Sequence, residues 1–295
     1  MLLGRNKKDQ EVASLNDLLP APTEELSPSR WHKGKPFVLL REEVGLTLTP
    51  EVPTASADSL CGLGSVWYYD SMVSEEDWMG QQLLQLRFIS PAGTAYRFST
   101  GQLVSAITDS GYQPVIGSLY PLQLIQKVDS VLRARSLYIL IMDERVKYQS
   151  DTVVGVTHEK FVPVIVDSVA CGNELAPFAV YFHREDEEGK VLEEGSFFAS
   201  LPGSREVGTS TSLDRYLALA DPYLLHPDIT PEIWNLIKRG SVQLDMTTEE
   251  VRLSWGRPSK IEKGASRTGM IELWYYSNNR ILQFWDGRLH KMGIL

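Results

Sequence analysis

Alternation of apolar and polar residues is the main pattern in the first two thirds of the chain. The stretch "LLQLRFISPAGTAYRFSTG" holds two alternating runs on either side of Pro91, Ala92 and Gly93, and this spacing is typical of a β-hairpin. A comparable series of strand, polar tip and strand returns in "PFAVYFHREDEEGKVLEEGSFF". The pattern predicts two β-rich modules of the small-barrel or sandwich type, residues 34–135 and 136–205. Their similarity suggests that the second repeats the first, although the spacing between matched strands differs.

A helical period interrupts the strands at the end of the first module. The segment "PLQLIQKVDSVLRAR" places Leu124, Ile125, Val128 and Leu132 at helical spacing, which puts them on one face of an α-helix. Pro121 suits the first turn of a helix, because an N–H at that position would have no intrahelical partner. We therefore predict one connecting helix.

The first 33 residues have a different composition from the rest. They are polar and charged, contain three prolines and offer only a brief apolar cluster, so the sequence predicts a flexible N-terminal tether over residues 1–33. Leu2, Leu3 and Gly4 resemble the residues that precede the lipidated cysteine of a bacterial lipoprotein. Arg5 stands where that cysteine would be, and an arginine cannot carry the lipid. Two interpretations stay open: a trimmed or altered envelope lipoprotein, or a chance likeness.

The stretch "DMTTEEVRLSWGRPSKI" near the C-terminus predicts a short capped helix. Thr247 suits the N-cap and Glu250 the third helical position, which together form a capping box. Met246 and Val251 flank that box as a hydrophobic staple, and Gly256 is placed to end the helix. A helix of this length is not stable in isolation, so we expect it to be held by packing.

The surrounding residues complete a small α+β unit. A second capped helix is expected from Thr230 to Gly240 in "TPEIWNLIKRG". The runs "MIELWYY", "RILQFW" and "RLHKM" then alternate as strands, and the Asp-Gly dipeptide before the last run is a strong hairpin signal. The sequence predicts a domain of two helices and a three-stranded antiparallel sheet over residues 225–295.

This C-terminal series resembles a known family. The string "RGSVQLDMTTEEVRLSWGRPSKI", followed by "ELWYYSNNRILQFWDGRLHKM", is similar to the BamE-like (SmpA/OmlA) domain over about residues 230–295. The resemblance implies a non-catalytic binding module, typically part of a bacterial envelope lipoprotein, and the best-known member assists the assembly of outer-membrane β-barrels. This chain differs from that member in its long N-terminal region and in the absence of the lipidated cysteine. The resemblance therefore carries over the fold and the class of protein, and no binding residue.

Aromatic residues in this domain indicate a possible interaction surface. Trp274 and Tyr276 share one face of the expected sheet, while Leu273 and Tyr275 share the other. Helices on one side would normally leave a polar outer face, but both faces are apolar here. We expect the uncovered face to carry some of Trp274, Tyr276 and Trp285. It would be buried by the β modules, by a second copy of the protein or by a foreign partner.

A second aromatic group lies in the first β module. The stretch "SVWYYDSM" places Trp67, Tyr68 and Tyr69 next to one another. Three consecutive residues of a strand cannot all face one core. At least one of them should be exposed or lie at a domain junction, so these three also join the candidate interaction surface.

Composition and charge limit the classes of partner. The 295-residue chain is 43% hydrophobic and carries a formal net charge of -9, which suits a globular protein and disfavours nucleic acid as a partner. It equally disfavours anionic membrane surfaces. No apolar run is long enough for a transmembrane helix. We expect a protein partner or self-association.

Motifs for cofactors and metals are incomplete. The run "CGLGSVW" starts like a dinucleotide fingerprint but has Trp67 at its third glycine position, and His158 begins an H-E-x-x-H motif that lacks its second histidine. The acidic run at 183–188 is explained as a solvated hairpin tip. Cys61 and Cys171 can be two buried thiols or one long-range disulfide. We therefore predict no cofactor, no metal and no catalytic residue.

The sequence thus favours a non-catalytic bacterial cell-envelope protein that acts through protein or cell-wall contacts, located in the periplasm or at the outer membrane, although the chain as given shows no signal peptide. One alternative is an enzyme such as a glycan hydrolase, with Asp70, Glu75, Asp77 and Trp78 around a cleft between modules. Another is a cytoplasmic regulatory protein.

Overall fold

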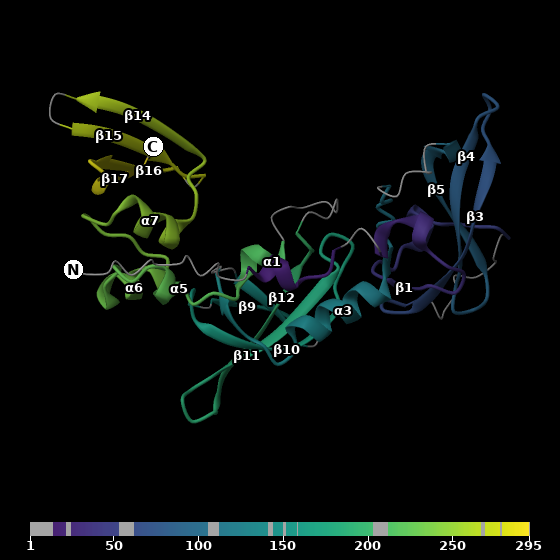
Figure 1. Cartoon of the computed structure of the whole chain (residues 1–295), viewed down its shortest axis with the longest axis horizontal. Helices are drawn as coiled ribbons and strands as arrows, with labels where there is room; N and C mark the ends of the chain where they lie inside the picture. The colour runs from purple at the N-terminus through teal and green to yellow at the C-terminus, as the bar shows by residue number, and fades with distance from the viewer. Residues whose placement is uncertain are drawn as a thin grey trace, which may run out of the picture.

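The computed structural model is a strand-rich mixture of helices and curled antiparallel sheets, so the predicted α+β, β-rich class is confirmed. Three sheet-containing parts follow one another along the molecule, with the first module and the C-terminal domain at opposite ends (Figure 1). The structure describes residues 14–21, 25–52, 62–105, 112–140, 144–149, 152–157, 159–202, 212–266, 269–277 and 279–294.

The first sheet has the strand order β2-β5-β4-β3-β1-β6 and encloses an aromatic core. Its strands are β1 (Pro36–Leu39), β2 (Thr49–Pro50), β3 (Val66–Glu76), β4 (Gln82–Ile89), β5 (Ala95–Leu103) and β6 (Leu119–Pro121), with the 3-10 turn η2 (Val44–Leu46) before β2. The predicted hairpin around Gly93 is present as β4–β5, and this glycine adopts a φ of 84° in the turn. Phe37, Trp67 and Phe88 fill the interior and are fully buried.

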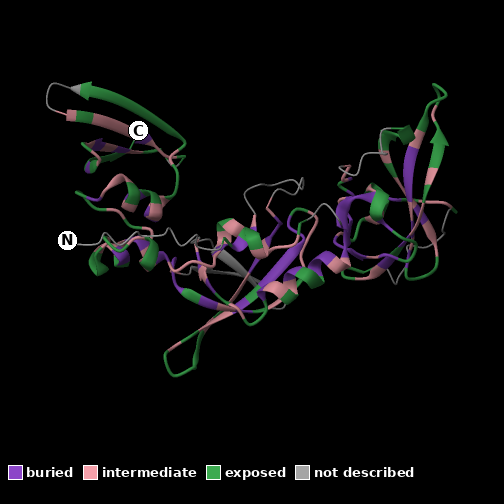
Figure 2. Ribbon diagram, in the orientation of Figure 1, coloured by how far each residue is buried: buried purple, intermediate pink, exposed green. Residues whose placement is uncertain are grey.

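The first two modules are joined by a helix and share strand β1, which contributes side chains to both cores. The predicted connecting helix is confirmed as α3 (Leu122–Leu132), and its apolar face packs on strand β10 (Pro163–Cys171) of the second sheet. Along β1, Phe37 belongs to the first core whereas Val38 belongs to the core of the second module. Figure 2 shows the buried residues running from the first sheet through this junction.

The second sheet has the order β12-β11-β10-β7-β13. Its strands are β7 (Ser136–Ile139), β10 (Pro163–Cys171), β11 (Phe178–Glu185), β12 (Val191–Ala199) and β13 (Leu217–Ala218), and a separate hairpin is formed by β8 (Glu144–Gln149) and β9 (Thr152–Thr157). This pairing order parallels β5-β4-β3-β1-β6 in the first sheet, as a repeat would produce; the repeat itself stays a prediction. The sheet extends past residue 205, because β13 adds to it after α4 (Leu213–Tyr216).

The N-terminal segment is packed wherever the structure describes it. Leu15, in α1 (Leu15–Leu18), lies in the core of the second module, Leu26 follows it there, and Trp31, just after η1 (Pro28–Arg30), lies in the first core. Glu25 forms a buried ion pair with Lys35. The expectation of a free tether is therefore wrong for residues 14–21 and 25–33. Their partners are distant in the sequence, and local composition cannot reveal such contacts.

The C-terminal domain stacks helices on one face of a sheet with the order β14-β15-β16-β17. Its elements are α5 (Pro222–Leu225), α6 (Pro231–Lys238), α7 (Thr248–Trp255), β14 (Lys260–Ser266), β15 (Gly269–Tyr275), β16 (Arg280–Trp285) and β17 (Arg288–Ile294). The predicted capping box of α7 is confirmed, since the Glu250 N–H donates to Thr247 Oγ1 at 3.2 Å and the Thr247 N–H to Glu250 Oε2 at 2.7 Å. The sheet has four strands instead of three. The additional strand, β14, is an exposed edge of alternating charges that carries little apolar signal.

Across the described part of the chain, every helix is too short or too polar to cross a membrane.

Candidate binding cleft

The aromatic group in β3 is divided between the core and the surface. Trp67 and Tyr69 are 0% and 4% exposed and lie in the first core, whereas Tyr68 is 47% exposed. Strand alternation explains this division, because successive side chains point to opposite faces. The expectation that one of the three is exposed holds for Tyr68. Trp67 and Tyr69 are core residues and offer no interaction surface.

The aromatic group in the C-terminal domain is also divided. Trp274 is fully buried beneath the helices, with its ring 4.5 Å from that of Phe284. Tyr276 packs edge-on against Trp255 of α7 at 5.3 Å. Of the three candidates for the uncovered face, Trp274 and Tyr276 therefore lie on the covered face. Alternation shows that two residues share a face, but not which face the helices cover.

Trp285 does lie on the outer face of this sheet. It shares that face with a group of partly buried apolar residues, Ile271, Leu273, Tyr275 and Ile281. Charged neighbours lean over them, since the Tyr275 hydroxyl donates to Glu262 Oε2 at 2.8 Å and Lys260 Nζ lies 5.5 Å from the Tyr275 ring. The outer face therefore combines apolar and charged side chains.

The carboxylates considered for an enzyme site are occupied by cations. Asp70 pairs with Lys33 at 2.7 Å and Arg87 at 2.6 Å, and these contacts lower the pKa of its carboxyl to about 2. Glu51, in the same network, accepts from Arg87 and Arg97, which lower its pKa as well. Such groups stay ionised at neutral pH and cannot act as general acids.

The remaining residues of that set do not converge on a catalytic pair. Glu75 contacts Gln85, and the two line a polar hollow of about 420 Å³ together with the paired Glu51. Asp77 caps its own turn, and Trp78 is 91% exposed at the hairpin tip. A glycosidase needs one protonated and one ionised carboxyl group across a groove, whereas the cations beside Asp70 and Glu51 favour the ionised form of both.

The acidic run at 183–188 forms the tip between β11 and β12. His183 lies between Asp167 and Glu185, at 2.6 Å from Nδ1 and 3.0 Å from Nε2. Burial lowers the pKa of His183, but the two carboxylates outweigh it and raise the pKa above its usual value. Across the described residues no cluster of three or more side chains has the arrangement of a metal site. Cys171 is partly buried, and Cys61, His158 and residues 2–5 lie outside the described part of the chain.

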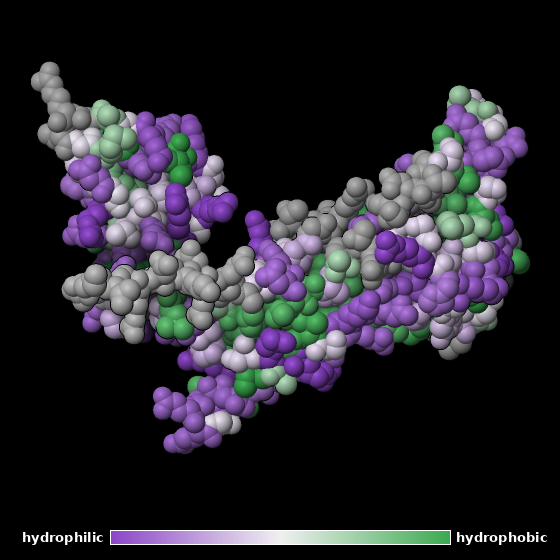
Figure 3. Space-filling model, in the orientation of Figure 1, coloured by the Kyte–Doolittle hydropathy of each residue, from purple (hydrophilic) through white to green (hydrophobic). Residues whose placement is uncertain are grey.

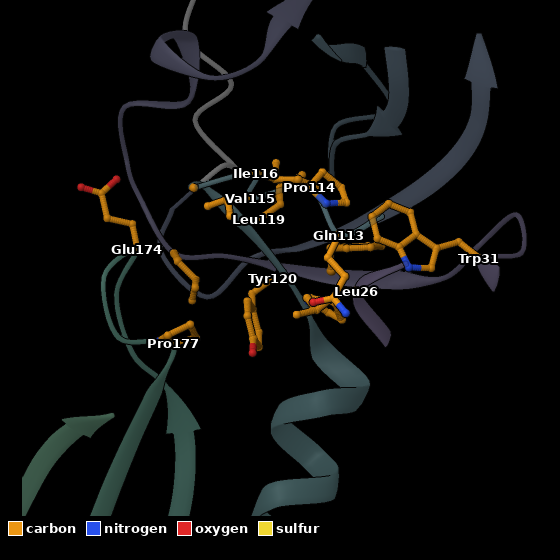
Figure 4. Close-up of a pocket in the computed structure, with 14 residues that line it drawn as sticks. Leu26, Trp31, Gln113, Pro114, Val115, Ile116, Leu119, Tyr120, Glu174 and Pro177 are labelled. Carbon is orange, nitrogen blue, oxygen red and sulfur yellow. The ribbon is translucent and has the colours of Figure 1, made fainter. Parts of the chain in front are cut away.

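A small cavity lies where the N-terminal segment meets the first two modules (Figure 4). Trp31, Leu26 and Val115 form apolar walls, Tyr120 of β6 lies between the two modules, and Pro177 closes the cavity from the second module. Its volume of about 30 Å³ holds one or two water molecules. It is a packing void and is too small for an organic ligand.

A much larger cleft separates the second module from the C-terminal domain. Its volume is about 900 Å³, within the range of ligand and peptide sites. Figure 3 shows a notch between these two parts of the molecule, with hydrophilic side chains on both sides. The apolar part of the wall comes from Leu140, Phe161, Ala218, Ala220, Pro222, Leu225 and Trp255.

Lys160 lies at the base of this cleft and joins its two walls. The side chain comes from the segment before β10, is 8% exposed, and donates to the carbonyl oxygens of Leu253 and Ser254 at the end of α7. A cation suits that position, because the C-terminal carbonyls of a helix carry partial negative charge. Burial lowers the pKa of Lys160 to about 8.

The other carbonyl groups at this end of α6 and α7 also have internal donors. The Trp255 indole N–H donates to Gly240 O at 2.9 Å, and the Ser254 hydroxyl donates to Ser241 O at 2.7 Å. The Tyr276 hydroxyl donates to Gly256 O at 3.2 Å. The carbonyl groups of Gly240, Ser241 and Gly256 are therefore hydrogen-bonded within the C-terminal domain.

Three guanidinium groups line the mouth of the cleft. The Arg239 side chain is 71% exposed, with its Nε 3.9 Å from Glu159; Arg252 lies over the Trp274 ring at 4.7 Å; and Arg257 is exposed. His226 also belongs to the lining, and its Nδ1 lies 2.9 Å from Glu249 Oε1. Among the described residues, the lining itself contains no aspartate or glutamate, and carboxylates lie close to it at Glu159 beside Arg239 and Glu249 beside His226. In a chain with a net charge of -9, this cleft is a local cationic site with apolar walls.

Sequence reasoning did not find this site. Lys160, Arg239 and Arg257 come from three segments that only the fold brings together. The one local signal is a basic residue next to the end of each helix, in "KRG" and "WGRP", and this pattern usually reflects the helix dipole alone.

Comparisons with protein-family models, curated proteins and solved structures find no match to this chain.

Proposed function

We propose that this protein is a non-catalytic binding protein of the bacterial cell envelope, and that its cleft between the second module and the C-terminal domain holds an acidic segment of a protein partner that also carries an apolar side chain. The observation that carries this proposal is the combination of Arg239, Arg252 and Arg257 at the mouth with apolar walls and, among the described residues, no carboxylate in the lining.

The chemistry of the lining selects the class of ligand. Guanidinium groups pair with carboxylates through geometrically matched hydrogen bonds, and they lose less hydration than an ammonium group when they do so. The apolar wall includes Trp255 and Phe161, and burial of an apolar ligand side chain against it would contribute favourable binding free energy. A small inorganic anion would use the charges and leave that wall exposed, whereas an acidic peptide with an aromatic or aliphatic anchor uses both.

Two features support the envelope assignment and the class. The C-terminal residues resemble a BamE-like domain, and two helices on one face of an antiparallel sheet are in keeping with that type of domain. The fourth strand, β14, is an addition to the pattern expected from the sequence. Of the carboxylates in the enzyme alternative, Asp70 forms ion pairs, Glu75 accepts from Gln85 and Asp77 caps its own turn.

The test uses the full-length protein and a fluorescein-labelled peptide that combines several glutamates with one tryptophan. Fluorescence anisotropy should show saturable binding that weakens as NaCl is raised, since exposed charge pairs are screened by salt. Arg239→Glu and Arg257→Glu should each weaken binding about tenfold, which is a change of roughly 1.4 kcal/mol in binding free energy. The reason is that each variant replaces a charge attraction with a repulsion. Arg252 is left unchanged because it also covers the Trp274 ring.

The controls separate charge from location. A peptide with lysines in place of the glutamates should not bind, and Lys190→Glu, an equal change of charge on the exposed β11–β12 tip, should leave the affinity unchanged. Equal affinity for the arginine variants and the wild type would place binding elsewhere and refute the proposal.

A further inference from the structure

The hairpin between β3 and β4 presents an unusual tip. Trp78 is 91% exposed and Met79 is 60% exposed, although tryptophan is normally at least partly buried. The tip projects at the end of the molecule farthest from the C-terminal domain (Figure 1) and is exposed along its length (Figure 2). A large aromatic side chain held in water in this way is typical of the anchor of an interface.

The tip has a defined conformation. Asp77 Oδ1 accepts from the N–H groups of Met79 at 2.9 Å and Gln81 at 2.8 Å. Gly80 adopts a φ of 74° and closes the turn. Because the backbone around Trp78 is already ordered, a partner would lose little conformational entropy in binding it.

The charge of this end of the module has one sign. Glu75, Glu76 and Asp77 precede the tryptophan, and residues 71–86 contain no lysine, arginine or histidine. Leu103, at the end of the neighbouring strand β5, and Val104 after it are each 40% exposed. The tip therefore needs a partner with an apolar hollow and a cationic rim.

We infer that the occupant of the cleft is the β3–β4 tip of a second copy of this chain. This inference rests on the proposed function, since it names the acidic segment that the cleft would hold. The tip and the cleft match in polarity and in charge. Trp78 and Met79 would contact the apolar wall, and the carboxylates at positions 75–77 would pair with Arg239 and Arg257. The two surfaces differ, so the contact is head-to-tail and each copy keeps one tip and one cleft available.

The contact is small, and its strength follows from its size. One hairpin tip in one cleft buries less than the roughly 1,200 Å² of a stable complex, so the association should be weak and concentration-dependent. Raising NaCl should reduce it, because the charge pairs lie at a solvent-accessible mouth. Loss of an anchoring tryptophan typically weakens an interface about 30-fold.

Sedimentation velocity of the full-length protein provides the test. The wild type should show a weight-average mass that rises with concentration, without a limiting dimer, and that falls at high NaCl. Trp78→Ala and the double variant Arg239→Glu/Arg257→Glu should each stay monomeric across the same range. Leu192→Ala, which removes a 53% exposed leucine from another hairpin, should behave like the wild type.

Mixing the two defective variants gives the decisive result. Trp78→Ala retains its cleft and the double arginine variant retains its tip, so an equimolar mixture should form a one-to-one complex that cannot grow further. A wild type that stays monomeric, or a mixture that does not associate, would overturn the inference. If the labelled acidic peptide still binds the cleft in that case, the proposed function stands and only the identity of the occupant is wrong.

Discussion

Lys160 holds the cleft together, and its replacement provides a quantitative test of the structure. Lys160→Met keeps the length and the apolar stem of the side chain and removes the ammonium group. The carbonyl oxygens of Leu253 and Ser254 then lose their buried donor. Each buried acceptor left without a partner costs about 1–3 kcal/mol. For the two acceptors together, we expect the C-terminal domain to lose roughly 2–6 kcal/mol of its unfolding free energy.

The pKa of Lys160 adds a dependence on pH with a definite sign. Burial lowers this pKa to about 8 in the folded protein, whereas the pKa of a lysine in the unfolded chain is about 10.4. Between these values the unfolded chain binds more protons than the folded one, so the contribution of Lys160 to stability rises with pH. The difference in stability between the wild type and Lys160→Met should therefore widen as the pH increases from 8 to about 10.

Urea unfolding followed by tryptophan fluorescence, at pH 7 and at the upper end of that window, measures both effects. Lys190→Met is the matched control, because Lys190 lies on an exposed tip and its loss should change the stability by less than about 0.5 kcal/mol. Equal unfolding midpoints for wild type and Lys160→Met would show that the second module and α7 are not joined in this way.

Three further predictions concern other parts of the fold. Thr247→Ala removes one half of the capping box with Glu250 and should cost about 0.5–2 kcal/mol in urea unfolding; an unchanged midpoint would contradict the role of this cap. His183→Gln should destabilise the protein most below pH 6.5 and progressively less as the pH rises, because the raised pKa of the folded state means that the stabilising charge is lost at higher pH; a difference that grew with pH would reverse the sign and refute it. Glu25→Ala should cost about 3–5 kcal/mol because it leaves the buried ammonium of Lys35 without its carboxylate, and protection of nearby amides from hydrogen exchange should fall; unchanged protection would mean that this segment is held without the ion pair.

Local signals in the sequence were sufficient for several elements. The capping box at Thr247, the N-cap at Thr230 and the turn at Gly93 depend on residues within a few positions of one another. The connecting helix α3 also followed from its own periodicity. Each of these elements is specified by contacts or dihedral angles inside a single segment.

The rest depended on partners that are distant in the sequence. Leu15 and Trp31 looked solvated because their neighbours are polar, yet their side chains lie in two different cores. Strand β14 escaped notice because an exposed edge needs no apolar face. Trp274 was one of three candidates for the uncovered face, and of these Trp285 lies there. Alternation defines two faces and leaves open which one receives the helices.

Mapping the bound peptide directly tests the central claim, that the cleft between the second module and the C-terminal domain is the binding site. The measurement is a titration of the ¹⁵N-labelled full-length protein with the acidic, tryptophan-containing peptide, followed by amide chemical shifts and by the indole N–H resonances. The account predicts that the perturbed signals cluster at Arg239, Gly240 and Arg257 and include the indole of Trp255. Perturbations confined to the outer face of the C-terminal sheet, around Trp285, would contradict it.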